Sequence, residues 1–312
     1  MTVPVVVVTG FLGAGKTTLI NHILTHADGR RIAAIVNDFG AINIDAELLE
    51  QAAGEIIGLR NGCICCSLQG DLLRTIGNLL RRTPAPEAIV IETSGIADPA
   101  PIVTSLLDPV VWREAPLDSV LGLVDADDAL INPQRRQDAL YRAQLAAADF
   151  VVLNKLDLVP PERVPQLTAE LHSAGMRGHV LHAEYGRLPM ELLFTAALYD
   201  PASKPAQPRK PAAERYDSVS WTSDRPISLP AFQAAIQSLA PDLVRAKGVL
   251  ALADQPGRPV LFQFAGQRAT LAAAPAPQEG QPPVRLVLIF EIGRLDRTAI
   301  AQALDASVAP QD

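Results

Sequence analysis

The stretch TGFLGAGKTT, which runs from Thr9 to Thr18, constrains the fold of this chain more than any other. Four valines precede it and the apolar-periodic run LINHIL follows it, which predicts a buried strand, a tight loop and a helix. The loop glycines lack a Cβ, so successive backbone N–H groups can point at one place, where the helix N-terminus adds its positive dipole end. The complete pattern G-x-x-x-x-G-K-T is typical of a nucleoside-triphosphate site. A glycine turn that binds nothing is the alternative, but such a turn needs no lysine and threonine after it.

Residues of this pattern are expected to take different parts of the nucleotide. Lys16 supplies a mobile cation for the β- and γ-phosphates, and the Thr17 hydroxyl is placed to ligate Mg²⁺. We expect the nucleotide to contact the following loop and helix residues: Gly10, Gly13, Ala14, Gly15, Lys16, Thr17 and Thr18.

A second apolar run, from Ala88 to Ile91, ends in Glu92. This is the arrangement of a buried strand that delivers a carboxylate beside the bound Mg²⁺, and a role in packing is the alternative. Gly95 follows three residues later, where its N–H could contact the γ-phosphate. We therefore expect Lys16, Thr17 and Glu92 to take part in catalysis.

The residues Ile32 to Val36 predict another buried strand, which opens into an acidic loop. This strand should end at the same sheet edge as the phosphate loop. We therefore interpret the segment with Asn37, Asp38 and Asp45 as a switch near the γ-phosphate. Asp38 is the candidate for orienting the attacking water. An ordinary polar turn is the alternative.

Three cysteines, Cys63, Cys65 and Cys66, lie just before a run with helical apolar spacing that starts at Ser67. A helix N-terminus lowers the pKa of a thiol, and thiolate is the form that binds metal. Three sulfurs at C-x-C-C spacing can converge on one cation such as Zn²⁺, with Co²⁺ and Ni²⁺ as further candidates. A closed structural zinc site has four protein ligands, so three favour a site that loads and releases its ion. Buried structural cysteines and a redox switch are the alternatives.

A predicted strand that ends in Asn154-Lys155-Leu156-Asp157 indicates which base is bound. The Asp157 carboxylate can accept hydrogen bonds from both N1–H and N2–H of guanine, while the Lys155 stem flanks the ring and Asn154 fastens the loop. Adenine has no matching pair of donors and would leave a buried carboxylate unpaired. Since the motif follows a complete phosphate loop, we expect GTP rather than ATP.

Composition and charge narrow the function classes. A chain of 312 residues, 48% hydrophobic and 20% charged, can form one large domain and a smaller one. The net charge of −7 argues against a nucleic-acid groove or an anionic-membrane patch. No apolar run approaches the ~20 residues that cross a bilayer, and the N-terminus does not resemble a signal peptide. The clustered cysteines do not resemble a secreted disulfide framework, so we expect a cytoplasmic protein.

A proline-rich stretch between Asp200 and Ala213 predicts a semi-extended linker. We place an α/β domain with a mostly parallel sheet at residues 1–200, the linker at 201–214 and a smaller α+β domain at 215–312. The smaller domain should contain a helix, several strands, a flexible loop and a solvated basic cluster. Among these, the helix is predicted at 229–239, two strands at 249–252 and 259–264, the loop at 272–283, and the basic cluster at Arg245 and Lys247.

His22 and His26, at positions i and i+4 of the first predicted helix, could in principle share a metal ion. No third ligand is evident nearby, which favours a solvated or partner-facing edge. The pair is therefore not among the predicted metal ligands.

The motifs GFLGAGKTT, NDFGAINID, NGCICC, IETSGIADP and NKLD, with RAKG and a closing strand and helix, extend over nearly the whole chain. Through them the chain resembles the CobW-type (cobalamin-synthesis-related) metallochaperone GTPases, relatives of the nickel-handling UreG and HypB proteins. The resemblance implies a P-loop GTPase domain, a CobW-type C-terminal domain, Zn²⁺ or a similar ion at the cysteines, and delivery to a client protein. The nucleotide roles of the family carry over onto Gly13, Gly15, Lys16, Thr17, Asn154 and Asp157.

Two departures from the family pattern concern the metal and the attacking water. The acidic loop usually reads NEFGE, whereas Asp38 replaces the first glutamate here and Ala41 the second. The histidine-rich stretch of many members is also absent, which favours handling of ions one at a time rather than storage.

Together these features predict a cycle in which GTP·Mg²⁺ orders the Asp38 loop and the cysteine turn, and hydrolysis relaxes both and frees the metal. Basal hydrolysis should be slow, ~10⁻⁴ to 10⁻² s⁻¹. The competing classes are a P-loop kinase or ligase and a non-catalytic metal or redox module. Within the leading class, a client-specific activator of the cobalt chelatase or nitrile hydratase type is the alternative. The sequence leaves the client, the physiological metal and a homodimer open.

Overall fold

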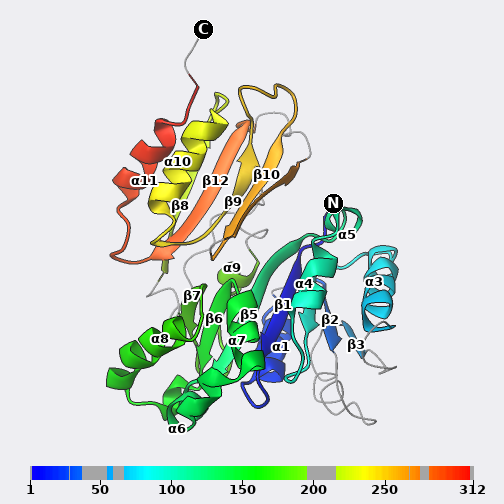
Figure 1. Cartoon of the computed structure of the whole chain (residues 1–312). Helices are drawn as coiled ribbons and strands as arrows, with labels where there is room; N and C mark the ends of the chain where they lie inside the picture. The colour runs from blue at the N-terminus through cyan, green and yellow to red at the C-terminus, as the bar shows by residue number, and fades with distance from the viewer. Residues whose placement is uncertain are drawn as a thin grey trace. The chain divides into compact units, whose positions relative to one another are not determined.

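The computed structural model describes residues 2–27, 29–36, 55–58, 67–194, 216–266, 268–274 and 281–309. The chain divides into two compact units, Met1–Leu193 and Phe194–Asp312 (Figure 1). The linker predicted at 201–214 lies outside the described residues, and the predicted domain boundaries beside it stay a prediction. Within the described ranges, no helix combines the length and the apolarity that a bilayer crossing requires.

Unit 1 is an α/β domain built on a parallel sheet. Its strands are β1 (Val5–Gly10), β2 (Ile32–Val36), β3 (Glu55–Gly58), β4 (Ala88–Glu92), β5 (Leu117–Asp125), β6 (Phe150–Asn154) and β7 (His179–His182). Its helices are α1 (Lys16–Thr25), α3 (Ser67–Leu80), α4 (Ala100–Leu106), α5 (Pro109–Trp112), α6 (Ala126–Ile131), α7 (Ala139–Ala147), α8 (Val164–Ser173) and α9 (Met190–Leu193). The strand order is β3-β2-β4-β1-β5-β6-β7, and every registered pair is parallel. The predicted fold class is therefore confirmed.

The central strands are apolar along their whole length because both faces of the sheet are covered. All six residues of β1 are buried. Val5 and Val7 belong to one core cluster with residues of α3 and α4, whereas the core cluster formed by α7 and α8 includes Val151 and Leu153 of β6. This packing fixes the strands and brings the carboxyl ends of β1 and β4 side by side, with Val8 opposite Glu92 in the register.

Unit 2 is an antiparallel sheet with helices. Its elements are β8 (Tyr216–Ser223), α10 (Leu229–Leu239), β9 (Leu243–Leu250), β10 (Val260–Ala265), β11 (Arg268–Ala273), β12 (Val284–Glu291) and α11 (Arg297–Asp305). The strand order is β11-β10-β9-β12-β8. Both helices contribute to its core, in which Phe232 of α10 contacts Phe262 of β10 edge to face at 5.0 Å. The predicted smaller α+β architecture matches this unit.

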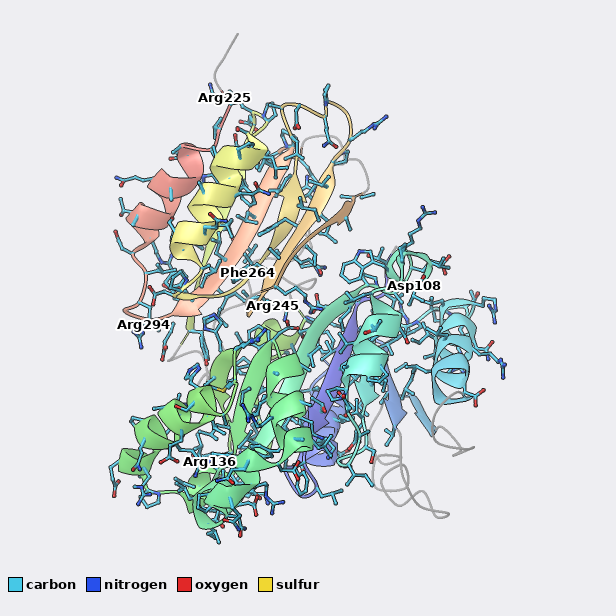
Figure 2. The ribbon with its side chains drawn as sticks, in the orientation of Figure 1. Asp108, Arg136, Arg225, Arg245, Phe264 and Arg294 are labelled. Carbon is cyan, nitrogen blue, oxygen red and sulfur yellow. The ribbon has the colours of Figure 1, made fainter. Side chains whose placement is uncertain are left out.

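Unit 2 differs from the prediction in three details. Strand β9 begins at Leu243, six residues before the predicted start, and β11 was not predicted at all. Arg245 is 2% exposed rather than solvated, and it lies on β9, an interior strand between β10 and β12. The register places Arg245 on the sheet face opposite Phe264 of the core cluster (Figure 2).

Candidate functional site

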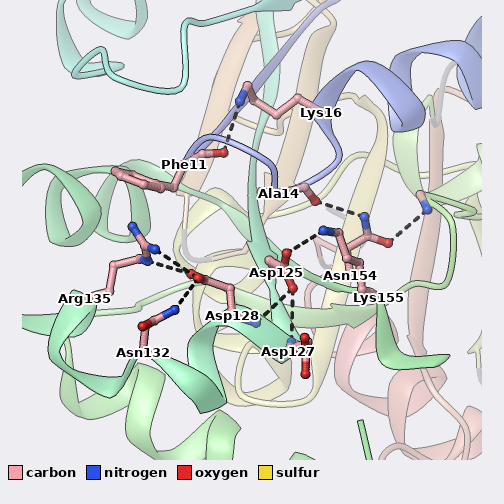
Figure 3. Close-up of polar contacts among 11 residues, drawn as sticks. Phe11, Ala14, Lys16, Asp125, Asp127, Asp128, Asn132, Arg135, Asn154 and Lys155 are labelled. Carbon is pink, nitrogen blue, oxygen red and sulfur yellow. Dashed lines mark hydrogen bonds and ion pairs between the residues drawn. The ribbon is translucent and has the colours of Figure 1, made fainter. Parts of the chain in front are cut away.

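The phosphate loop connects β1 to α1 and holds its lysine inside. Lys16 is 7% exposed, and its ammonium donates to the carbonyl oxygens of Gly10 at 3.0 Å and Phe11 at 3.2 Å (Figure 3). These contacts curl the lysine over the loop. The N-cap residue of α1 is Gly15, which has no side chain to cap the helix, so the backbone N–H groups of the first turn begin at the phosphate loop. The arrangement suits an anion with several oxygens.

Glycine is required at two loop positions for reasons the structure makes explicit. Gly10 has φ +135°, and a Cβ there would lie 2.3 Å from the Leu123 carbonyl oxygen on neighbouring β5. Gly15 has φ +97°, and its Cβ would lie 2.4 Å from Nδ2 of Asn154. Gly13 also has a positive φ, +78°. The loop therefore runs in contact with the ends of β5 and β6.

Two oxygen ligands for a hard cation meet beside the lysine. The Thr17 hydroxyl donates to Oε1 of Glu92 over 3.5 Å, and Glu92 is 4% exposed at the end of β4. Two ligands of a single Mg²⁺ lie roughly 3–4 Å apart, since each Mg–O bond is about 2.0–2.1 Å. Thr17 and Glu92 therefore fit the Mg²⁺ that a nucleoside triphosphate carries.

The segment after β4 packs directly against the phosphate loop. A Cβ on Gly95 would lie 2.8 Å from the backbone nitrogen of Leu12, so only glycine permits this approach. The buried Gln144 of α7 donates to the carbonyl oxygens of Gly95 and Ala97, each at 3.2 Å. The sequence did not predict a role for Gln144, although a glutamine at a position where the helical spacing calls for an apolar residue indicates a buried polar contact.

Asn154 ties the two sides of the site together. It is 2% exposed, and its Nδ2 donates to the Ala14 carbonyl oxygen while its Oδ1 accepts from the Gly186 backbone N–H, both at 3.0 Å (Figure 3). One side chain thus connects the phosphate loop with the loop that follows β7. Lys155 next to it has φ +61°, which turns the chain sharply at the strand end.

A charged pair orients Lys155. Its ammonium lies 2.6 Å from Oδ2 of Asp125, the last residue of β5. The other carboxylate oxygen of Asp125 accepts from the backbone N–H groups of Asp127 and Asp128 and so caps α6 (Figure 3). Asp157 is exposed in the short turn Leu156–Leu158, where its carboxylate can accept from an outside donor. No role for Asp125 was predicted from the sequence, because Lys155, its partner, lies far along the chain.

A further contact supports the loop from the side. The guanidinium carbon of Arg135 lies 4.4 Å from the centre of the Phe11 ring. Arg135 also forms an ion pair with Asp128 of α6, with Nε 2.6 Å from Oδ2. Thr93 and Thr9 link β4 to β1 through their hydroxyl groups at 2.9 Å.

The predicted sulfur ligands and the predicted water-orienting residue cannot be placed. Cys63, Cys65, Cys66 and Asp38 all lie outside the described residues. The described chain does fix the points from which these segments leave. Val36, the last residue of β2, lies opposite Glu92 of β4 on one side and Gly58 of β3 on the other.

Family profiles match both units of the chain. The profile described as CobW/HypB/UreG, nucleotide-binding domain, matches residues 4–181, and the profile described as Cobalamin synthesis protein cobW C-terminal domain matches residues 216–308. The chain belongs to the CobW family. The resemblance seen in the sequence is confirmed, and as a member with a complete phosphate loop the chain is a GTPase.

Two relatives found by sequence agree with this assignment. The zinc chaperone CobW of Pseudomonas aeruginosa is 38% identical over 223 residues, which are 61% of this chain and 59% of that protein. The zinc chaperone CobW of a Sinorhizobium species is 30% identical over 352 residues, covering 98% of this chain and 97% of that protein. A similar solved structure is the crystal structure of Zn(II)-bound YjiA GTPase from E. coli, whose sequence is 25% identical. The match covers 99% of this chain and 100% of the YjiA chain, with a TM-score of 0.48.

Proposed function

We propose that this CobW-family GTPase is a metallochaperone that binds Zn²⁺ through Cys63, Cys65 and Cys66 and delivers it to a client protein. The names of its relatives as zinc chaperones support the choice of metal. The sequence supports the ligand set, since these three cysteines are all that the chain contains.

The observation that carries the proposal is the register at the carboxyl edge of the sheet. Glu92 lies opposite Val36, and Val36 lies opposite Gly58. Neighbouring strands are about 4.8 Å apart, so the backbone at Gly58 leaves the sheet roughly 10 Å from that of Glu92. Cys63 follows five residues later, within at most roughly 18 Å of chain. The acidic loop leaves from Val36, between the two. This topology supports a direct coupling of the nucleotide and the sulfur ligands.

Residues of the phosphate loop would carry out hydrolysis mainly by positioning charge. Lys16 would exchange its carbonyl partners for phosphate oxygens, and the first turn of α1 would add backbone donors. Thr17 and Glu92 would hold Mg²⁺, which neutralises charge on the β- and γ-phosphates. The Gly95 segment packs against the phosphate loop, and through this contact the presence of the γ-phosphate would affect the rest of unit 1. Without a partner we expect turnover of ~10⁻⁴ to 10⁻² s⁻¹.

The base would be selected at the ends of β5 and β6. Asp125 holds the Lys155 ammonium to one side, which leaves its stem beside the base, and Asn154 keeps the turn in place. Asp157 would accept two hydrogen bonds from guanine. The expected preference for GTP follows from a charge-assisted pair that adenine cannot form.

Product analysis and metal titration test the proposal together. The protein should convert GTP to GDP and phosphate much faster than it converts ATP, and Asp157→Ala should remove that preference. It should bind one equivalent of Zn²⁺ tightly, and Cys63→Ser should weaken this binding. Transfer of phosphate to an acceptor would instead indicate a kinase or ligase. Absence of hydrolysis even with metal and client present would indicate a non-catalytic module.

A further inference from the structure

The turn that follows β7 contains an exposed aromatic residue in a backbone conformation that such residues rarely adopt. Tyr185 has φ +54° and is 61% exposed. Among the described residues, only Lys155 shares a positive φ without being glycine. A bulky side chain in the left-handed region is strained, and such strain persists where the surrounding structure imposes it, often at a ligand site. Packing in the core does not explain this conformation, since the ring lies largely in solvent.

The Tyr185 turn is fixed on its N-terminal side to the turn that would bind the base. Strands β6 and β7 pair in parallel about 4.8 Å apart, so the turns after them, which contain Lys155 and Tyr185, start side by side. Two backbone hydrogen bonds link these turns to each other. The Ala183 N–H donates to the Leu153 carbonyl oxygen at 3.0 Å, and the Ala183 carbonyl oxygen accepts from the Leu156 N–H at 3.4 Å.

On its C-terminal side the same turn is fixed to the helix that begins at the phosphate loop. The Gly186 N–H donates to Oδ1 of Asn154 at 3.0 Å. Gly186 has φ +66°, and a Cβ there would lie 2.8 Å from the backbone nitrogen of Leu19 in α1. The backbone beside Tyr185 therefore contacts both the base-binding turn and the helix whose first residues would take the phosphates. A nucleotide that reaches from one to the other would pass beside this turn.

We propose that Tyr185 stacks on the base of the bound nucleotide, an inference that rests on the proposed GTP site. The guanidinium carbon of Arg187 lies over the Tyr185 ring, 5.7 Å from its centre, which is a cation–π distance. With a cation over one face and the ring largely exposed, the other face can accept a planar base. Stacking adds affinity without selecting a base, because every base has a π-face. The choice of guanine stays with Asp157.

Calorimetry on the full chain with Mg²⁺ and three probes, GDP, ADP and pyrophosphate, tests this role. Tyr185→Asn removes the ring and introduces a residue that tolerates a positive φ. It should weaken the binding of GDP and of ADP by the same factor, about tenfold. The affinity for pyrophosphate, which has no base, should stay unchanged. Tyr185→Phe is the matched control, since it keeps the ring and should bind GDP as tightly as the unsubstituted chain.

The same titrations separate this inference from the proposed GTP site. The preference for GDP over ADP should survive in Tyr185→Asn and disappear in Asp157→Ala. Absence of that preference in the unsubstituted chain would count against the guanine site itself. A preserved preference with no loss of GDP affinity in Tyr185→Asn would count against stacking alone.

Two further readouts distinguish stacking from a structural role of the turn. In NMR spectra, the Tyr185 ring protons should give cross-peaks to H8 of bound GDP, and these should be absent in Tyr185→Asn. Urea unfolding without nucleotide should show no loss of stability in Tyr185→Asn, because the new residue relieves the backbone strain. The proposal would be overturned by an equal loss of GDP affinity in Tyr185→Phe, by an equal loss for pyrophosphate, or by missing cross-peaks in the unsubstituted chain.

Discussion

Gly15→Ala should destabilise unit 1 more than an alanine at another glycine with a similar positive φ. Gly15 has φ +97° and its Cβ would lie 2.4 Å from Nδ2 of Asn154, whereas Gly175 has φ +107° and nothing within 4 Å of its Cβ. Both substitutions place an alanine in the left-handed region, at about 1–3 kcal/mol. Only Gly15→Ala also displaces the Asn154 side chain.

The extra loss can be worked out from the contacts of Asn154. Its displacement breaks the hydrogen bonds with the Ala14 carbonyl and the Gly186 N–H, each worth about 0.5–1.5 kcal/mol. Gly15→Ala should therefore reduce the free energy of unfolding by about 1–3 kcal/mol more than Gly175→Ala does. The contribution of unfolded-chain entropy is the same for both and cancels in the comparison.

Urea unfolding of the nucleotide-free protein measures this difference. The chain has two tryptophans, one in each unit, so a Trp221→Phe background leaves Trp112 as the reporter of unit 1. Adding Asn154→Ala to Gly15→Ala should have little further effect, because the contact is already lost. Equal destabilisation by the two alanines, or additive effects of Gly15→Ala and Asn154→Ala, would refute the reasoning.

Three further predictions concern single side chains. Burial raises the pKa of Tyr141 from 10.0 to about 12, so stability is full below pH 10 and falls as the pH rises toward 12. Tyr141→Phe should remove this alkaline loss of up to about 3 kcal/mol, measured by urea unfolding across that range, and a persisting loss would contradict it. Glu92→Gln should raise the Mg²⁺ concentration for half-maximal hydrolysis by about tenfold or more, whereas Glu87→Gln, at an exposed ion pair before β4, should leave it unchanged. Asp125→Asn keeps a cap for α6 but loses the charge that orients Lys155. The affinity for guanine nucleotides, measured by calorimetry, should therefore fall about tenfold. An unchanged affinity would show that Lys155 does not contribute to binding of the base.

Local patterns predicted the elements of unit 1 well because its key residues follow buried strands directly. Lys16 and Thr17 follow β1 within one loop, and Glu92 ends β4, so sheet topology alone brings them together. The supporting contacts could not be read in this way. Gln144 reaches Gly95, and Asp125 reaches Lys155, across separations that no periodicity encodes.

The errors in unit 2 have a similar physical cause. Strand β11 is short, alternates between half-buried and exposed residues and adjoins a proline-rich stretch, so its sequence carries little strand signal. Arg245 was expected in solvent because arginine usually is. It is instead buried on β9, whose interior position between β10 and β12 only the three-dimensional register reveals.

The central claim is that the nucleotide and the zinc ion are coupled, and a competition titration tests it most directly. Zn²⁺ affinity would be measured against a chelator, with the protein loaded with Mg²⁺ and either GDP or a non-hydrolysable GTP analogue. The account predicts tighter binding in the triphosphate state by about 1–3 kcal/mol, or roughly 5- to 150-fold. Equal affinities in the two states would contradict the coupling and leave a GTPase that does not control its metal.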